Sequence, residues 1–410
     1  MSDEQAAGPL SGITVTDFFW LIAGPATSRI LADFGADVIK IESASRMDQI
    51  RESGVWPSPE LRTASSRNSV FNDCNTNKRS ITLNLNKPEA IEIAKQLVAQ
   101  SDIVTNNFKG DRMDRWGLGY EDLKQIKPDI IMLTMPVMGT TGPYLEYGSN
   151  GNGVVAYGGI NMGMGFPERP PVGMGPLYSD FSTPYVAVSA LMAALHHRER
   201  SGEGTFIDLA QLEATVSLLG PQILDYTANG AAPERRGNRS AEWAPHGVYP
   251  CRGDDRWIAI AVRSDAEWVR FSALTGQPEL AEDGRYATNA GRLANVEALD
   301  DAIGAWTSER DAWELTHELQ QAGVAAGVVE DLEDMLTRDP HLPERHFVEV
   351  PGDDDGLSYI THGQPARLNG QSPHLERPPN MGEHTEEVLK GMLGMSDERY
   401  VELLVDGVLS

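Results

Sequence analysis

The fold of this chain is decided near its start by residues 13–42, ITVTDFFWLIAGPATSRILADFGADVIKIE. The run 13–18 predicts a buried strand, residues 26–34 predict a helix, and residues 36–41 predict a second strand. Two strands joined by a single helix indicate a right-handed crossover in a parallel sheet. The fold class that this unit predicts is therefore α/β.

The same alternation recurs downstream and extends the sheet. Strands and helices are predicted in turn at residues 80–85, 88–99, 103–105, 120–126 and 129–134. Strands that alternate with single helices indicate a Rossmann-like parallel sheet that helices cover. Loops at the edge of such a sheet hold ligands, and the long gap Ser43–Arg79 is one candidate.

The composition changes in the middle of the chain. Residues 147–176 are rich in Gly, Met and Pro, which predicts a loop that is either a plain connector or a lid over an active site. A long helix is predicted over residues 182–200. Ser182 or Thr183 can cap this helix, and Pro184 suits its first turn.

Further along, the sequence predicts a second, smaller unit. A hairpin is expected within residues 246–262, with its turn at residues 253–255. This unit spans roughly residues 231–329, and its helices are expected at residues 265–275, 296–306 and 311–322. One late helix is expected in the tail, at residues 397–404.

The charge balance excludes some classes of partner. The chain has 410 residues, with 34 Lys and Arg against 60 Asp and Glu, and its formal net charge is −26. Nucleic acids and anionic membranes are bound by basic faces, so we expect neither as a partner. A small anionic ligand stays allowed, because its site needs only local basic groups.

Several signatures of cofactors and compartments are missing from the sequence. Cys74 and Cys251 form neither a disulfide framework nor a zinc pattern, and the nine histidines form no metal-binding array. The first strand is not followed by GxGxxG, so no nicotinamide dinucleotide is expected. Without a secretory signal or an apolar run of about 18 residues, we expect a cytoplasmic, oligomeric enzyme or binding protein that holds no metal.

Two basic clusters stand out against the acidic background. Residues 75–80, NTNKRS, precede a predicted strand, and residues 106–115, NNFKGDRMDR, follow another. Arg and Lys at such loops can pair with phosphate oxygens, while Phe108 or Trp116 could cover a base. Solvated surface charge is the alternative. Two clusters on one α/β body make a cofactor that contains phosphates an equal candidate, and the residue pattern leaves both interpretations open.

Asp180 is a third candidate. It precedes the predicted helix 182–200, where a carboxylate faces the positive end of the helix dipole and nearby amides could hold an oxyanion. A carboxylate in such a place can act as a nucleophile. A capping or turn role is the alternative, and the residue pattern leaves both open.

Several longer stretches occur in one fixed order along the chain. They are AGPATSRILADFGADVIKIE (23–42), NKRSITLNL (77–85), NNFKGDRMDRWGLGYEDL (106–123), LYSDFSTPYVAVSALMAALHHRERSGEGTFIDLAQLEA (177–214), HGVYPCRGDDRWIAIAV (246–262), QAGVAAGVVEDLEDML (321–336) and PNMGEHTEEVL (379–389). In these stretches the chain resembles the family III CoA-transferases, which include formyl-CoA and carnitine CoA-transferases and the related α-methylacyl-CoA racemases.

The resemblance implies a particular domain organisation. A large Rossmann-like α/β domain would comprise residues 1–220 and 331–410, and residues 221–330 would form a smaller α+β domain. The family also implies an interlocked homodimer, in which two subunits pass through each other like chain links.

The resemblance also implies a reaction. Asp180 falls on the position of the catalytic aspartate, which attacks an acyl-CoA thioester and carries the acyl group as a mixed anhydride and then coenzyme A as a thioester. A carboxylic acid is the acceptor, and the family favours succinyl-CoA as the donor. Coenzyme A enters as part of the substrate, and no metal takes part.

Other positions are assigned to the substrate by the same resemblance. Ile22 falls at the acyl site, where an apolar side chain indicates an acyl group other than formyl. The positions expected to contact coenzyme A are Asn107, Phe108 and Arg115, with Lys78 and Arg79 as expected partners of its phosphates.

Two other functions stay open. A racemase would need a His in a Gly-His-Asp motif, and the corresponding stretch here is Gly148-Ser149-Asn150, which supplies no second acid–base group. A non-catalytic CoA-binding subunit of a heteromeric transferase is the other alternative, although retention of Asp180 opposes it. Residues 241–247 stand where formyl-CoA enzymes have a mobile glycine loop, and they are bulkier here.

Overall fold

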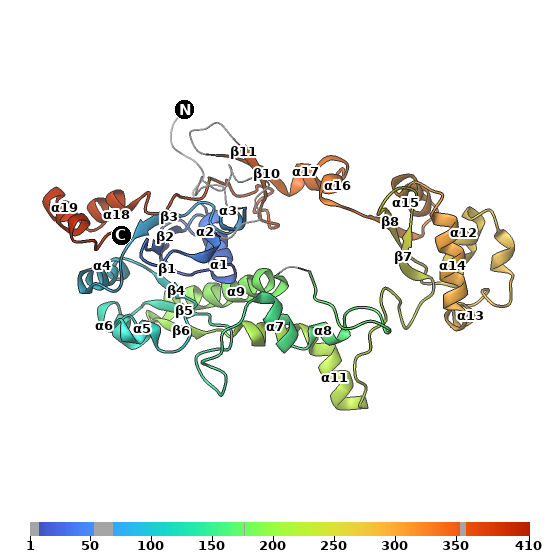
Figure 1. Ribbon diagram of the computed structural model, residues 1–410, viewed down its shortest axis with the longest axis horizontal. Coiled ribbons are helices and arrows are strands. Elements are labelled where there is room, and N and C mark those ends of the chain that lie inside the picture. The colour runs from blue at the N-terminus through green and yellow to red at the C-terminus, as the bar shows by residue number, and fades with distance from the viewer. Residues whose placement is uncertain (1–7, 53–68, 176, 353–357) are drawn as a thin grey trace. The chain divides into compact units, whose positions relative to one another are not determined.

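The computed structural model describes residues 8–52, 69–175, 177–352 and 358–410. The chain forms two compact units (Figure 1), which we call the large unit and the small unit. The large unit comprises Met1–Asn161, Gly173–Ala232 and His346–Ser410, and the small unit comprises Met162–Val172 and Pro233–Arg345.

A six-stranded parallel sheet forms the centre of the large unit, in the order β3-β2-β1-β4-β5-β6. The strands are β1 (Thr14–Phe18), β2 (Asp37–Glu42), β3 (Arg79–Thr82), β4 (Ile103–Asn106), β5 (Ile131–Thr134) and β6 (Thr205–Asp208). In β1, Val15 pairs with Val38 of β2 and with Ile103 of β4. The predicted α/β fold with a parallel sheet is confirmed.

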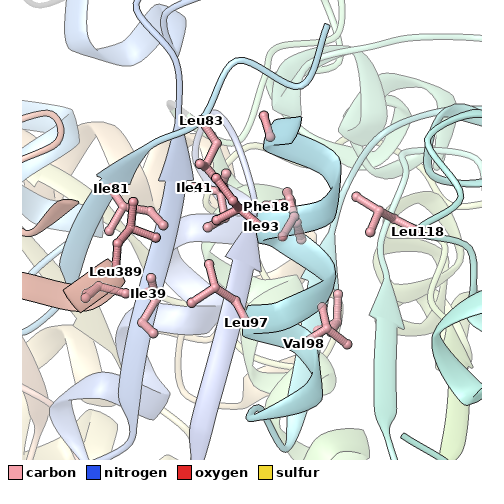
Figure 2. Packing of buried hydrophobic residues seen from close by; sticks show 14 of the residues in the cluster. Phe18, Ile39, Ile41, Ile81, Leu83, Ile93, Leu97, Val98, Leu118 and Leu389 are labelled. Carbon is pink, nitrogen blue, oxygen red and sulfur yellow. The ribbon is translucent and has the colours of Figure 1, made fainter. Parts of the chain in front are cut away.

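Helices cover both faces of this sheet, because its strands alternate apolar side chains between the two sides. Figure 2 shows one face, where Phe18, Ile39 and Ile41 meet Leu97 and Leu389. The helices on this face are α4 (Pro88–Ala99), α6 (Tyr120–Ile126), α18 (Thr385–Gly391) and α19 (Asp397–Val405). On the opposite face, α1 (Ala23–Asp33) and α9 (Tyr178–Ser201) pack over residues such as Val15, Val38 and Ile131.

Two predictions about the middle of the chain were wrong. Helix α9 begins at Tyr178 and not at Ser182, because Leu177 takes a left-handed conformation (φ 62°) and turns the chain into the helix four residues early. The expected loop 147–176 contains two short helices, α7 (Gly151–Tyr157) and α8 (Ile160–Gly163). Asn150 caps α7 by accepting a hydrogen bond from the Gly153 amide. Pro176, the last residue of that predicted loop, lies outside the described residues.

Shorter elements complete the large unit. They are α2 (Gln49–Glu52), α3 (Ser69–Cys74), α5 (Arg112–Arg115), α10 (Gln211–Val216), η3 (Ser217–Leu219), α11 (Gly220–Asn229), β10 (Phe347–Pro351) and β11 (Ser358–His362). The last two strands pair with each other in an antiparallel sheet.

The small unit has an antiparallel sheet of its own, formed by β7 (His246–Pro250), β8 (Trp257–Ala261) and β9 (Ala325–Val329). The predicted hairpin is confirmed, since β7 and β8 pair around the turn at residues 253–255. Its helices are α12 (Asp265–Leu274), η4 (Pro278–Ala281), α13 (Asn289–Ala294), α14 (Val296–Thr307), α15 (Ala312–Gln321), α16 (Leu332–Thr337) and α17 (Leu342–Arg345). Across the described parts of both units, none of the helices is long and apolar enough to cross a bilayer.

Candidate active site

The strand order of the large sheet reverses between β1 and β4, which are neighbours in space although two strands separate them in sequence. In open α/β sheets, the crevice outside the carboxyl ends of the strands at such a reversal is where ligands bind. Here β1 ends at Phe18 and is followed by Trp20, while β4 ends at Asn106 and is followed by Phe108. The topology therefore brings these two loops together at one edge.

A cavity of about 250 Å³ lies at this edge. It has room for part of a ligand and is smaller than the sites that enclose whole drug-sized molecules. Aromatic rings and basic side chains line it, among them Trp20, Phe108, Trp116, Arg46, Lys109, Arg112 and Arg115. Phe108 stands edge-on to Trp20 and to Trp116, with ring centroids 5.7 and 5.6 Å apart.

The basic side chains sit beside these rings. The Arg46 guanidinium lies 5.5 Å from the centroid of Trp20, and that of Arg112 lies 5.6 Å from Trp116. Arg115 is exposed and pairs with exposed Asp111 at 2.7 Å, an ion pair that water weakens. Cations beside aromatic planes suit a ligand that carries both phosphates and a flat base.

Acidic residues also line the cavity, and their charges are partly neutralised. Glu42 is buried and accepts hydrogen bonds from Arg51 at 2.7 and 2.6 Å and from Ser80 at 2.6 Å. Glu146 is exposed, so water screens its carboxylate, and Lys109 donates to its backbone carbonyl at 3.0 Å. The basic side chains therefore dominate the charge at the mouth of the cavity.

Buried and half-buried polar groups hold the Trp20 wall of the cavity in place. The Asn107 side chain donates to the Trp20 carbonyl at 2.7 Å and accepts from the Trp20 amide at 3.0 Å. Lys40 donates to the Phe19 carbonyl at 2.7 Å and pairs with Asp48, which accepts from the Leu21 amide. Asn107 thus acts on the site through the backbone of Trp20, because both ends of its amide are engaged there.

The structure does not bring every predicted residue to this cavity. Lys78 is fully buried, where it donates to the Pro25 carbonyl at 2.8 Å and lies 3.6 Å from Asp17. Burial lowers the pKa of Lys78 to about 8, although the charge of Asp17 opposes the effect. Arg79 forms ion pairs with Asp37 and Glu387. Lys78 therefore lies in the interior and Arg79 in ion pairs with acidic side chains, and neither is among the residues that line this cavity.

Ile22 is also absent from the walls of the cavity. It is the residue before the first turn of α1, and its carbonyl accepts a hydrogen bond from the Ala26 amide at 2.8 Å. Among the predicted cofactor positions, Phe108 and Arg115 line the cavity, and Asn107 supports it.

Asp180 lies in the first turn of α9, inside the helix and not before it as predicted. Its side chain is buried, with 8% of the residue exposed. Oδ1 accepts a hydrogen bond from the Gln211 side chain at 3.1 Å. Oδ2 is buried and has no hydrogen-bond partner among the residues that the structure describes. An unpartnered buried carboxylate oxygen is costly, which is a mark of a functional group.

The surroundings of Asp180 shape its reactivity. Burial raises the pKa of Asp180, and the hydrogen bond from Gln211 opposes that rise. A Cβ atom at Gly151, the first residue of α7, would lie 1.8 Å from Oδ2, so only glycine leaves room for the carboxylate there. The arrangement offers a buried carboxylate whose second oxygen keeps its lone pairs available for nucleophilic attack.

Three important residues escaped the sequence analysis. Arg46 lies in the gap Ser43–Arg79, a candidate ligand loop, so its place in the sequence could have identified it as a candidate. Gly151 and Gln211 contact Asp180 from elements 29 and 31 residues away in sequence. No local pattern marks such contacts. The part of the gap at residues 53–68 lies outside the described residues.

Comparison with known proteins adds independent information. The profile of CoA-transferase family III matches residues 10–385. Succinyl-CoA–D-citramalate CoA-transferase of Chloroflexus aurantiacus is 33% identical over 399 residues, which cover 97% of each chain. Succinate–glutarate CoA-transferase of Agrobacterium fabrum is 33% identical over 93% of this chain and 95% of its own. The crystal structure of a CAIB/BAIF family protein from Brucella suis superposes with a TM-score of 0.85, at 33% identity, over 94% of this chain and all of its own.

Proposed function

Because this chain belongs to CoA-transferase family III, we propose that it moves coenzyme A from an acyl-CoA donor to a carboxylic acid through covalent esters of Asp180. The observation that carries this proposal is the buried Asp180 carboxylate, whose Oδ2 has no partner in the described part of the chain. Coenzyme A thioesters are the substrates of this family, and the chain is an enzyme of that class.

The chemistry follows from a carboxylate in a sheltered place. Asp180 attacks the donor thioester and takes up the acyl group as a mixed anhydride, and the CoA thiolate then converts the anhydride into an Asp180 thioester. The donor acid leaves in that step. The acceptor carboxylate then attacks the Asp180 thioester, which gives a second mixed anhydride and releases the thiolate. The thiolate finally attacks the acceptor acyl carbon, which forms the new acyl-CoA and frees the Asp180 carboxylate. Burial of Asp180 keeps water from these activated esters, so the thioester energy passes to the acceptor and is not lost to hydrolysis.

The cavity at the carboxyl ends of β1 and β4 is the proposed site for the phosphates and base of coenzyme A. Arg46, Arg112 and Arg115 supply positive charge there, and Trp20 and Phe108 supply aromatic surface. The proposal leaves Lys78 and Arg79 out of the phosphate site, because both are engaged elsewhere. The protein carries a net charge of −26, so affinity must come from these local contacts.

We propose succinyl-CoA as the donor. The Chloroflexus aurantiacus and Agrobacterium fabrum relatives are named for succinyl or succinate transfer. An apolar Ile22 at the expected acyl position is consistent with an acyl group larger than formyl. A racemase is less favoured, since Asn150 is engaged in capping α7 and cannot titrate as the second acid–base group.

The assembly and the compartment are further parts of the proposal. The family resemblance favours an interlocked homodimer in the cytoplasm. Sedimentation at micromolar concentration should find a dimer, and a stable folded monomer would contradict the interlocked arrangement.

Trapping the covalent intermediate tests the proposed function. Incubation with succinyl-CoA should place a hydroxylamine-sensitive ester on Asp180, which mass spectrometry of the peptide detects. Asp180→Ala should lose both the ester and transfer activity. Exchange of the α-hydrogen of a 2-methylacyl-CoA with deuterated water would instead indicate a racemase. Failure of the wild type in both assays, across a panel of acyl-CoAs and dicarboxylates, would indicate a non-catalytic subunit.

A further inference from the structure

A chain of hydrogen bonds fixes the side chain of Gln211 beside Asp180. The Ser179 hydroxyl donates to the Gly151 carbonyl at 3.1 Å, and with its proton used in this way it can only accept from Gln211. Gln211 Nε2 lies 3.3 Å from Ser179 Oγ and 3.1 Å from Asp180 Oδ1. The two N–H groups of one amide nitrogen therefore point at these two oxygens, and an inverted amide would break both contacts.

The backbone of Gln211 is held as firmly as its side chain. Gln211 is the first residue of α10 and is buried, with 5% of the residue exposed. Its amide donates to the Pro136 carbonyl at 3.3 Å, and its carbonyl accepts from the Thr215 hydroxyl at 2.8 Å. The donor to Oδ1 is therefore preorganised, which is the property that a catalytic hydrogen-bond donor needs.

The two oxygens of Asp180 differ as a result. Oδ1 has its hydrogen bond from Gln211, whereas Oδ2 lies against Gly151 with no partner in the described residues. Oδ2 keeps its lone pairs available and is the oxygen that attacks the thioester carbon. The carbon–sulfur bond then breaks, CoA leaves as the thiolate, and Oδ2 bridges the acyl carbon and Cγ.

Every later attack on Asp180 occurs at Cγ and sends charge to Oδ1. When the thiolate sulfur bonds to Cγ, the electron pair of the Cγ–Oδ1 double bond moves onto Oδ1. Collapse restores that double bond, breaks Cγ–Oδ2 and releases the donor acid. When the acceptor carboxylate attacks Cγ of the thioester, Oδ1 takes the charge again before the carbon–sulfur bond breaks.

We propose, on the basis of the proposed function, that Gln211 is the oxyanion donor for the two attacks on Asp180 Cγ. The N–H group that contacts Oδ1 in the resting enzyme already lies on the atom where negative charge develops. Such a donor is worth about 10²–10³-fold in rate in other enzymes.

The chain contains a matched control for this proposal. Gln364 Nε2 donates to Oδ2 of the buried Asp33 at 2.7 Å, so Gln364→Met removes the same kind of amide–carboxylate hydrogen bond away from Asp180. Gln211→Met and Gln211→Glu are the test variants. Methionine keeps a long unbranched side chain without a donor, and glutamate keeps the shape without the amide.

Two measurements test the assignment. Rapid quench with succinyl-CoA, read by mass spectrometry of the Asp180 peptide, should show that Gln211→Met forms the Asp180–CoA thioester about 10²–10³-fold more slowly than the wild type. The acidic limb of the pH profile of kcat/KM should move to higher pH. The N–H group of Gln211 lowers the pKa of Asp180, so its loss lets that pKa rise. Gln211→Glu should move the limb further, since a second carboxyl group then faces Asp180.

The control separates a catalytic role from a structural one. Gln364→Met should keep the wild-type rate of thioester formation and the wild-type acidic limb. The assignment would be overturned if either Gln211 variant formed the thioester at the wild-type rate and kept the wild-type acidic limb of the kcat/KM profile. It would also be overturned if Gln364→Met slowed thioester formation as much as Gln211→Met. Absence of any ester on Asp180 in the wild type would contradict the proposed function itself. That result differs from a failure of the Gln211 assignment, in which the wild type still forms the ester.

Discussion

Two buried aspartates of the large unit, Asp33 and Asp180, differ in how their carboxylates are paired. Asp33 lies at the end of α1, and Asp180 lies at the start of α9. Asp33 receives hydrogen bonds on both oxygens, from Arg29, Thr76, Asn77 and Gln364 at distances of 2.7–3.1 Å. Asp180 receives one on Oδ1 from Gln211, and no donor in the described residues reaches Oδ2.

Burial raises the pKa of both carboxyl groups, and the opposing contacts differ. At Asp33 the charge of Arg29 and several hydrogen bonds oppose the rise, whereas at Asp180 only the contact from Gln211 is resolved. A fully paired buried carboxylate holds segments of the chain together. A partly paired one keeps an oxygen available for chemistry, at a cost to stability.

The largest effect should come from removing each carboxylate in turn. Asp180→Asn should lower the rate of thioester exchange by at least about 10⁴-fold, because the nucleophile is lost. Asp33→Asn should keep the wild-type rate per folded molecule. Thioester exchange at saturating substrate measures both variants, and an equal loss in Asp33→Asn would erase the functional difference between the two sites.

The same two substitutions should have opposite effects on stability. Asp33→Asn places an N–H group against converging donors and should lower the free energy of unfolding by about 3 kcal/mol. Asp180→Asn should raise the melting temperature at neutral pH. The pKa of the Asp180 carboxyl group is raised in the folded state. The carboxyl group therefore stabilises the fold at pH values below its unfolded-state pKa, and this stabilisation is lost as the pH rises through its folded-state pKa.

Thermal melting from pH 3 to 8 checks the signs of these changes. The stabilisation by Asp180→Asn should shrink as the pH falls toward the ordinary pKa of aspartate, where Asp180 is protonated in both states. A melting temperature that falls with Asp180→Asn at neutral pH would show that Asp180 is a structural residue like Asp33.

Crowding the free oxygen should have a smaller effect than removing it. Gly151→Ala would place Cβ 1.8 Å from Asp180 Oδ2, so the carboxylate must turn away, and kcat should fall by about 10²-fold. Gly148→Ala is the control in the same segment, because a Cβ there meets no atom within 4 Å. Equal kcat values for the two variants would show that the position of Oδ2 does not matter.

The comparison extends to two arginines, where the expected effect is smallest. Both form ion pairs, but the pair of Arg115 with Asp111 is exposed to water, whereas the Arg79 side chain is more buried in its pairs. Arg115 lines the cavity with an exposed side chain, and Arg79 forms ion pairs with Asp37 and Glu387. Arg115→Ala should weaken binding of coenzyme A about tenfold, the value of a hydrogen bond to a charged group. Arg79→Ala should leave it unchanged. Titration calorimetry with coenzyme A measures the affinity of both variants. A larger loss of affinity in Arg79→Ala than in Arg115→Ala would instead place the phosphates at the NKRS loop, residues 77–80.

Much of the fold could be predicted because its signals are local. Helices α4 and α6 span the predicted residues, and Pro88 marks the start of α4. The predicted start of α9 is wrong because the prediction places Pro184 in the first turn of the helix. Pro184 lies in the second turn, inside the helix, where it removes the hydrogen bond to the Asp180 carbonyl and its ring crowds that carbonyl.

Less of the site could be predicted, because its contacts join distant segments. The residue pattern left Asp180 as a cap or a nucleophile, and only the family resemblance chose between them. Lys78 follows two polar residues and looks exposed in the sequence, yet it pairs in the interior with Asp17 of β1, 61 residues earlier. Such pairing depends on which strands become neighbours, and a local sequence window carries no record of that order.

The packing of α18 and α19 on the central sheet has a consequence for synthesis on the ribosome. Leu389 and Leu403 cover the same face as Ile39 and Ile41, and Thr82 bonds the carbonyl of Leu409. Helix α4 belongs to the same cluster and is made soon after Ile41, whereas Leu389 is made about 350 residues after it. At ~5–20 residues per second, the part of the face that α18 and α19 cover therefore stays exposed for roughly 20–70 s. Until then the nascent chain presents an aggregation-prone surface, and a chaperone that shields the strands of residues 14–83 should raise the yield of folded enzyme.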